Sequence, residues 1–329
     1  MVAAAVSLAR RLADELLFPV AAEVDRGDRV PAEVLDALAE NGFYGIGAPP
    51  ELSVLDLPDD ESRAAVVEAL AGGCLAAAFV WMQHRGALRA LARSGHVAEL
   101  ASGRVRAGLA IGAVTRTGPP LIAASPVDGG WSLTGSAPWV TGWGMVDVLL
   151  MAARDATDQV IWSLVDAVEG PSLRVEPLDL VAVQASGTVT LRVDELVVPS
   201  ARVVGTEPHA DYLARDAESL TFNGFLAVGV AGRAIALLGE DGEQLAAELT
   251  RVRDRLLHAG PDDAPAARAG ASELALRSAA ALAVHDGSRS VLATSHAARL
   301  IREATFLLTF GTRPTIREQL LARLSASRQ

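Results

Sequence analysis

Apolar residues in the first third of the chain recur with the period of an α-helix. One face of the first expected helix carries an apolar residue at every fourth position, namely Leu8, Leu12, Leu16, Val20 and Val24. Pro19 is expected to kink or end this helix because it has no backbone N–H. Pro31 is expected to begin a second helix, which the Asn-Gly pair at 41–42 closes. Residues 64–70 and 75–91 predict two more helices.

The middle of the chain consists of short apolar runs separated by turn residues. Six runs predict strands, at residues 109–114, 131–133, 146–152, 160–165, 173–175 and 189–193. In the last run Val189, Leu191 and Val193 share one face, and a short turn should lead to a second apolar run that stops at Pro199. Residues 106–207 therefore predict a β-domain of six or more strands.

Helical periodicity returns after about residue 208. It predicts five helices, at residues 220–238, 245–257, 266–284, 295–308 and 316–324. A helical region at 1–105, a β-domain at 106–207 and a shortened helical region at 208–329 indicate an α+β fold rather than a parallel α/β sheet. The glycine fingerprint of a Rossmann domain does not follow any strand, so the sequence does not support that fold.

Composition narrows the class of protein. The 329 residues are 50% hydrophobic and carry a net charge of −11, which disfavours nucleic acid and anionic membranes as partners. The chain has no apolar run near the roughly 20 residues of a membrane helix. Cys74 is its single cysteine, which excludes an internal disulfide and fits a cytoplasmic location. The histidines lack metal-ligand spacing, so no metal site is expected.

Three stretches of the sequence carry a recognisable pattern. The first is Phe18–Pro49, with its Pro-Ala-Glu and Tyr-Gly-Ile-Gly motifs. The second joins Gly130–Gly135 to Trp139–Asp147 and contains Gly-Trp-Ser-Leu-Thr-Gly and Trp-Val-Thr-Gly. The third is Ala185–Gly205. In this order they resemble the acyl-CoA dehydrogenases, flavoproteins that remove a hydride from an acyl thioester. The resemblance implies three regions: helical, β and helical.

The resemblance also implies an FAD site in the β-domain. It places Trp139, Val140 and Thr141 against the flavin ring, with the Thr141 hydroxyl near the polar edge of the ring. A flat, amphipathic ring needs an apolar wall and a few hydrogen-bond donors of this kind. Without the resemblance, Trp139 would be interpreted as a core aromatic residue and Thr141 as a strand residue.

Two further cofactor contacts follow from the resemblance. The loop of Ala113, Val114 and Thr115 would line the pyrimidine side of the flavin. Arg289 stands in a segment that the family uses on a neighbouring subunit's nucleotide, where its charge would neutralise a pyrophosphate. The alternative for Arg289 is a solvent-facing loop residue.

The chain departs from the family at the catalytic carboxylate. Most members carry a Glu after a Tyr near the C-terminus, where this chain has Phe310 and then Gly311. Other members place the Glu on the helix after the β-domain, where this chain has Phe222 and Asn223. None of these side chains can remove a proton, and a general base is typically worth ~10²–10⁴ in rate. The family's base is therefore missing at both positions.

His84 is the one candidate catalytic residue outside this pattern. It lies three residues after Trp81, on the same helix face, and could donate to an oxygen atom near a flavin. The alternative is a histidine near a helix end that bonds a backbone carbonyl.

Three functional hypotheses follow from the resemblance. The leading one is an FAD-dependent oxidoreductase that acts on an acyl thioester, as a homo-oligomer or as the subunit without a base in a heteromer of two family chains. A flavin-dependent monooxygenase on the same fold is the second, in which His84 would have a role. A catalytically inactive scaffold subunit is the third.

Overall fold

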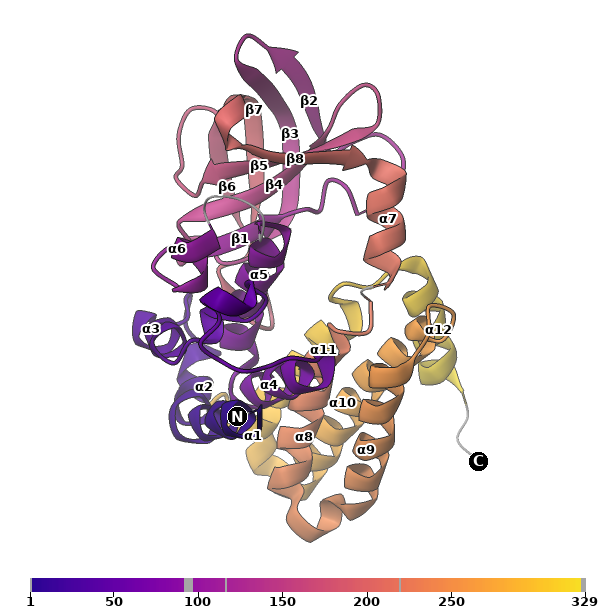
Figure 1. The fold of residues 1–329 in the computed structure, drawn as a ribbon. Coiled ribbons are helices and arrows are strands. Elements are labelled where there is room, and N and C mark those ends of the chain that lie inside the picture. The colour runs from indigo at the N-terminus through magenta and orange to yellow at the C-terminus, as the bar shows by residue number, and fades with distance from the viewer. Residues whose placement is uncertain (1, 92–96, 116, 219, 327–329) are drawn as a thin grey trace.

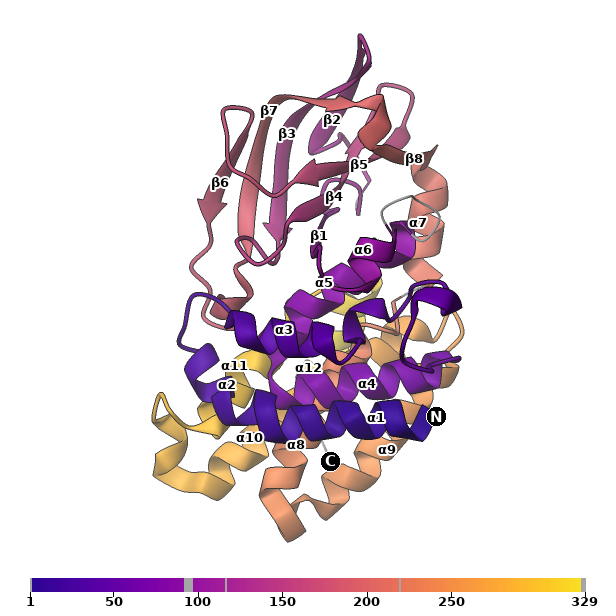
Figure 2. The ribbon, with the colours of Figure 1, turned by 60° about the vertical axis from the view of Figure 1, so that its left-hand side comes forward.

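The computed structural model describes residues 2–91, 97–115, 117–218 and 220–326. A β-sheet forms one end of the molecule, and helices from both ends of the sequence pack together at the other end (Figures 1 and 2). Helix α7 (His209–Glu218) leads from the sheet back to the helices. The expected α+β fold is confirmed.

The N-terminal helices follow the predicted pattern closely. They are α1 (Val2–Leu12), the π-helical turn η1 (Ala13–Leu17), α2 (Phe18–Val24), α3 (Ala32–Glu40), α4 (Asp60–Gly73), α5 (Leu75–Leu91) and α6 (Val97–Ala101). The helical segment does not end at Pro19. The turn η1 leads directly into α2, and Pro19 lies in the first turn of α2, where a missing N–H costs little. Asn41 is the C-cap of α3, and Gly42 follows it with φ +79°.

Eight strands form one sheet in the described part of the chain. They are β1 (Ala107–Ala110), β2 (Ile122–Val127), β3 (Gly130–Val140), β4 (Val148–Arg154), β5 (Gln159–Asp166), β6 (Leu173–Pro177), β7 (Val189–Pro199) and β8 (Val203–Pro208). The order is β6-β7-β3-β2-β4-β5-β8, and β1 pairs in parallel with β4. The turn expected after Val193 is instead a bulge at Glu195, with φ +48°, inside the continuous strand β7.

After α7, the described residues 220–326 contain five α-helices. They are α8 (Gly224–Leu238), α9 (Glu243–His258), α10 (Ala264–Asp286), α11 (His296–Thr309) and α12 (Pro314–Ser325). Helix α8 begins at Gly224 rather than at Leu220, which lies in the turn before it. No helix of the described part has the length and the apolar character needed to cross a bilayer.

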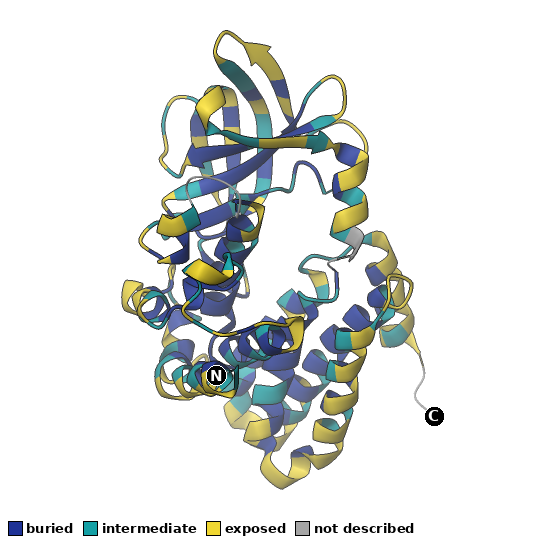
Figure 3. Ribbon diagram, in the orientation of Figure 1, coloured by how far each residue is buried: buried dark blue, intermediate teal, exposed yellow. Residues whose placement is uncertain are grey.

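The N-terminal and C-terminal helices share one hydrophobic core. Buried residues of α1 to α5 and of α8 to α11 form a single cluster, and Figure 3 shows them on the facing sides of these helices. The cluster depends on a close crossing of α4 and α8, where a Cβ on Gly72 would lie 3.0 Å from the carbonyl oxygen of Gly229. The crossing packs α8 directly against α4.

Candidate functional site

Trp139 stands out at the end of β3. Its φ is +61°, a conformation that costs a non-glycine residue about 1–3 kcal/mol. The pairing of β3 with β7 shifts register between Ala137 and Val140, so the strain coincides with a bulge. The indole is nevertheless 63% exposed, so burial does not explain the strained position of this ring. A large aromatic ring held out in this way is suited to stacking against a flat ligand.

The residues after Trp139 are buried and hold the loop in place. Val140 and Thr141 are buried, and the Thr141 hydroxyl lies 2.9 Å from the hydroxyl of Thr188. The Thr188 hydroxyl in turn lies 2.7 Å from the Ser186 hydroxyl. The N–H of Gly142 donates to the Ser186 carbonyl at 2.9 Å. The hydroxyl of Thr141 is therefore already bonded within the protein, and its contact with a flavin stays a prediction.

The second predicted segment lies next to the first. Gly112 packs against Pro138, where a Cβ on the glycine would lie 3.0 Å from the Pro138 carbonyl oxygen. Ala113 and Val114 are buried, whereas Thr115 is half-buried. The structure thus places the segments 113–115 and 139–141 side by side at one end of the sheet. Among these six residues, Trp139 and Thr115 retain the most side-chain surface for a ligand.

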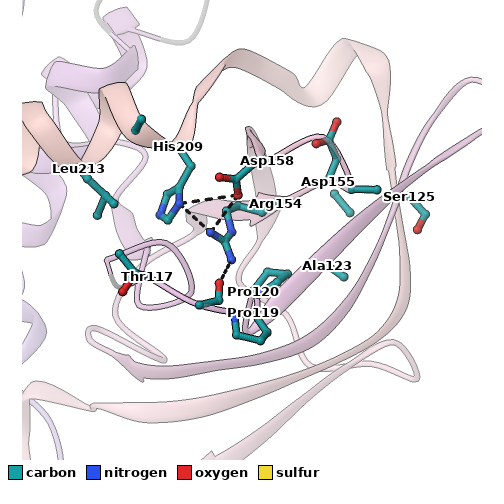
Figure 4. A pocket seen from close by; sticks show the side chains of 14 residues that line it. Thr117, Pro119, Pro120, Ala123, Ser125, Arg154, Asp155, Asp158, His209 and Leu213 are labelled. Atoms are coloured by element: carbon teal, nitrogen blue, oxygen red, sulfur yellow. Dashed lines mark hydrogen bonds and ion pairs between the residues drawn. The ribbon is translucent and has the colours of Figure 1, made fainter.

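A cavity of about 600 Å³ opens beside this end of the sheet (Figure 4). Arg154 is buried in its wall and donates to His209 Nδ1 at 2.6 Å, to Asp158 at 3.0 Å and to the carbonyl of Gly118. The Nε2–H of His209 donates to the Val114 carbonyl at 2.8 Å. His209 is therefore the Nε2–H tautomer, and this cluster bonds the carbonyls of Val114 and Gly118 rather than offering a free acid or base.

The sequence did not indicate this cluster. Arg154 lies at the end of a strand and His209 at the start of a helix, 55 residues apart. Neither residue belongs to a recognisable motif. Only the packing of α7 against the sheet brings the two side chains together.

The two positions at which the family carries its Glu lie side by side in the structure. Asn223 precedes the first residue of α8 and Gly311 follows the end of α11. The Asn223 amide nitrogen lies 3.6 Å from the point that a Cβ on Gly311 would occupy. This proximity agrees with the alignment of both segments. An amide and a glycine hydrogen atom stand at the two positions where the resemblance implies a carboxylate.

Aromatic side chains surround this junction of α5, α8 and α11. The ring of Phe79 on α5 contacts Phe306 and Phe310, with centroids 5.0 and 4.8 Å apart. Phe222 packs 6.1 Å from Phe225. The aromatic side chains around the junction are thus apolar, and none of them is an acid.

One charged group enters the junction. The Arg85 guanidinium of α5 lies over the Phe222 ring, with Cζ 3.9 Å from its centroid. Arg85 is 6% exposed and its Nε is buried without a hydrogen-bond partner. Burial, with the nearby charge of Arg89, lowers the pKa of Arg85 to about 9, yet a guanidinium stays protonated at neutral pH. Arg85 belongs to no motif that would single it out, and it directly follows His84, which has the more familiar chemistry.

His84 is a buried residue that makes only structural contacts in the described part of the chain. Its Nε2 lies 3.0 Å from the Leu100 carbonyl, and its Nδ1 accepts from the N–H of Ala107 at 3.0 Å. Burial lowers the pKa of His84 to about 4, and its ring packs edge-on to Tyr44. The ring therefore joins α5 to α6 and β1 and has no nitrogen left for a substrate.

The remaining candidates lie elsewhere. Arg289 is exposed on the short 3-10 turn η7 (Gly287–Val291), away from the sheet. Cys74 is buried, and burial raises the pKa of its thiol to about 11, which leaves it unreactive at neutral pH. The described residues contain no cluster of three or more metal-ligating side chains.

Comparisons with known proteins agree on the fold. Residues 3–101 match the family model of the acyl-CoA dehydrogenase N-terminal domain, and the whole chain has the acyl-CoA dehydrogenase fold. The resemblance drawn from the three sequence segments is therefore confirmed.

Individual relatives agree with this class. Benzylmalonyl-CoA dehydrogenase of Aromatoleum aromaticum is 27% identical over 240 residues, which is 68% of this chain and 63% of that protein. The match thus spans less than two thirds of that relative. Butyryl-CoA dehydrogenase from Megasphaera elsdenii superposes with a TM-score of 0.80 at 16% identity, covering 98% of this chain and 97% of that one.

A glutaryl-CoA dehydrogenase from Mycobacterium smegmatis, solved in complex with FADH2, superposes with a TM-score of 0.84 at 15% identity. The superposition covers 98% of this chain and 94% of that one. At these identities the structures show a shared fold.

Proposed function

We propose that the chain is an FAD-binding oxidoreductase of the acyl-CoA dehydrogenase type that acts on an acyl thioester and does not supply the catalytic base. It would serve as one subunit of a heteromer whose other chain carries the carboxylate. The observation that carries this proposal is the junction of Asn223 and Gly311, where the Asn223 amide nitrogen lies 3.6 Å from the point that a Cβ on Gly311 would occupy. These are the two positions at which the resemblance expects the base, and neither residue is an acid.

The end of the sheet fits the ring of a flavin. Trp139 offers an exposed aromatic face at a strained backbone position, and half-buried Thr115 offers a hydroxyl on the adjoining segment. The bonds from Thr141 to Thr188 and from Gly142 to Ser186 keep this wall rigid. When bound, the flavin would supply the hydride acceptor. Arg289 lies on a separate surface, so its contact with a nucleotide requires a neighbouring subunit.

The residues of this chain would position and shield the thioester. The aromatic cluster of Phe79, Phe306 and Phe310 would line the junction with apolar surface and limit the access of water to the thioester. Trp139 would hold one face of the ring. The α-proton of the thioester would pass to a carboxylate of the partner, because a phenyl ring and an amide cannot accept it.

The monooxygenase hypothesis receives no support from His84, whose two ring nitrogens are both bonded to backbone groups. A cytoplasmic location stays a prediction, which the single buried cysteine supports.

The test is anaerobic reduction by an acyl-CoA. We expect co-expression with a family chain that bears the Glu to yield a yellow complex that the thioester bleaches. This chain alone should show no bleaching, even when flavin is added. A homo-oligomer of this chain that bleaches by itself would contradict the role without a base. Colourless protein in both preparations would instead identify an inactive scaffold.

A gain-of-function variant sharpens this test. Asn223→Glu places a carboxylate at the junction and should speed thioester-dependent bleaching of the flavin-loaded chain by about 10²-fold or more. Asn223→Gln has a similar length without the charge and serves as the matched control. Equal rates for the two variants would mean that the junction is not where the α-proton is removed.

A further inference from the structure

Arg268 on α10 is a buried guanidinium that forms no ion pair with any residue in the described ranges. The residue is 2% exposed. Its two terminal nitrogens donate to neutral acceptors, the Ser272 hydroxyl at 2.5 Å and the Phe310 carbonyl at 3.1 Å. Burial by itself lowers the pKa of Arg268 to about 10, so the group stays charged at neutral pH. Its positive charge therefore has no nearby carboxylate to balance it.

Two other buried arginines show the usual arrangement. Arg299 lies 2.6 Å from Glu303, and Arg154 lies 3.0 Å from Asp158. A charge removed from water is costly unless an opposite charge or several hydrogen bonds offset that cost. Arg268 has only hydrogen bonds, so a negative charge brought close to it would be stabilised more strongly than in water.

Arg268 adjoins both sides of the junction. Its Cδ lies 3.4 Å from the point that a Cβ on Gly224 would occupy, and Gly224 directly follows Asn223. The carbonyl that receives its hydrogen bond belongs to Phe310, which directly precedes Gly311. The guanidinium therefore lies next to the neighbours of both residues at which the resemblance expects the base.

The same arginine ties α10 to the end of α11. Ser272, which accepts from Arg268, donates in turn to the Leu307 carbonyl at 2.8 Å. Arg268 and Ser272 thus bond two carbonyls at the C-terminal end of α11, those of Phe310 and Leu307. These bonds fix the turn at Gly311 relative to the start of α8.

Other charges around the junction do not replace that of Arg268. Arg85 of α5 lies over the Phe222 ring and adds positive charge from another side. The contact of α9 at Gly224 is the apolar side chain of Leu256. The elements packed around α10 contribute ion pairs whose charges largely cancel, namely Arg313 with Asp216, Arg299 with Glu303, and Arg277 and Arg323 with Glu273.

We propose that Arg268 is a positioning residue for the base: it fixes the two sides of the junction, and its charge keeps a carboxylate that enters the junction ionised. This inference rests on the proposed function and deepens it, because it names a residue of this chain that acts on the partner's carboxylate. Among the rings of Phe79, Phe306 and Phe310 a carboxyl group would otherwise favour its protonated form. Only the ionised form can accept the α-proton of the thioester.

A thiol placed at the junction reports this charge without flavin, thioester or partner. Asn223→Cys introduces it, and Cys74→Ala in the same chain removes the single native thiol. The ultraviolet absorbance of the thiolate, followed against pH, gives the pKa of the new thiol. Adding Arg268→Met should raise this pKa by about one pH unit, because a nearby cation favours the thiolate.

Two controls separate the charge of Arg268 from packing and from net charge. Arg268→Lys keeps the charge, so the thiol pKa should stay close to the value with arginine. Arg277→Met removes an arginine further along α10 that is paired with Glu273, and it should leave the thiol pKa unchanged. Thermal unfolding checks that each variant folds. Arg268→Gln, which can still donate to the Phe310 carbonyl, replaces Arg268→Met if the latter does not fold.

A pH profile extends the test to the reaction. In the flavin-loaded Asn223→Glu chain, thioester-dependent bleaching needs the ionised carboxyl group, so its rate should rise with pH through the pKa of that group. Arg268→Met removes a cation that favours the ionised form and therefore raises this pKa. The profile should move to higher pH by about one unit.

Each outcome decides the inference. Equal thiol pKa values with and without Arg268, or an equal rise in Arg268→Lys and Arg268→Met, would overturn the role of the charge and leave the thioester role intact. A rise of the same size in Arg277→Met would also overturn it, because the effect would then come from net charge. If the thiol pKa rises as expected but no variant bleaches with a thioester, the thioester role fails and the effect of Arg268 on the junction stands.

Discussion

The end of the sheet and the junction of the helices differ in how their buried polar groups are hydrogen-bonded. At the sheet end Thr141, Thr188 and Ser186 bond one another, and the strain falls on the exposed Trp139. At the junction the rings are apolar, and the buried Arg85 lacks a partner among the described residues. The first region has the features of a rigid binding wall. The second region has no carboxylate at Asn223 or Gly311 and holds a buried cation, so the proposed function predicts that a partner supplies the base there.

The largest effect is expected where a buried arginine is structural. Arg299→Met leaves Glu303 buried without its partner at 2.6 Å and should lower the free energy of unfolding by about 3–5 kcal/mol. Arg85→Met removes a cation that has no such partner and should stay within about 1 kcal/mol of the wild type, or exceed it. Urea denaturation measures both. An equally large loss for Arg85→Met would show that Arg85 stabilises the fold as much as the paired Arg299 does.

The next effect concerns pH and the histidine beside Arg85. Burial lowers the pKa of His84 from 6.5 to about 4. As the pH falls, the His84 ring therefore binds a proton in the unfolded chain before it does so in the folded chain. The contribution of the neutral His84 to the free energy of unfolding is complete above pH 6.5 and is lost as the pH falls toward 4. The loss should reach about 3 kcal/mol in the wild type. His84→Asn, which has no titrating ring, should lose less over the same interval, as shown by urea denaturation at each pH. Parallel profiles would contradict a buried neutral His84.

The smallest effect tests the strain at the sheet end. Trp139→Gly relieves a positive φ and should raise the stability of the flavin-free protein by about 1 kcal/mol, while weakening flavin binding. Glu195→Gly is the matched control, because Glu195 has φ +48° in the bulge of β7. It should give a similar gain and leave flavin affinity unchanged. Thermal unfolding and flavin fluorescence measure the two quantities. Unchanged flavin affinity in Trp139→Gly would remove Trp139 from the binding wall.

The sequence predicted the long elements well because their patterns are strong. The helix expected at 75–91 has those same bounds in the structure, as α5. Elements with weak patterns were missed: β2 contains Ala, Ser and Pro, β8 contains Gly and Pro, and α7 is mostly polar. Their conformation depends on neighbours. In strand β2, for example, every residue of Ile122–Val127 pairs with β3. This pairing stabilises an extended conformation that the residues of β2 do not favour by themselves.

The sequence by itself determined the α+β order of the chain, the resemblance to the acyl-CoA dehydrogenases and the absence of a glutamate at Phe310–Gly311 and Phe222–Asn223. These features depend on residue type and spacing along the chain. The tertiary structure decided that these two positions face each other, that both nitrogens of His84 are occupied and that Arg85 is buried without an acid. Such properties depend on the distances between segments far apart in sequence, which are set by the packing of α5, α8 and α11.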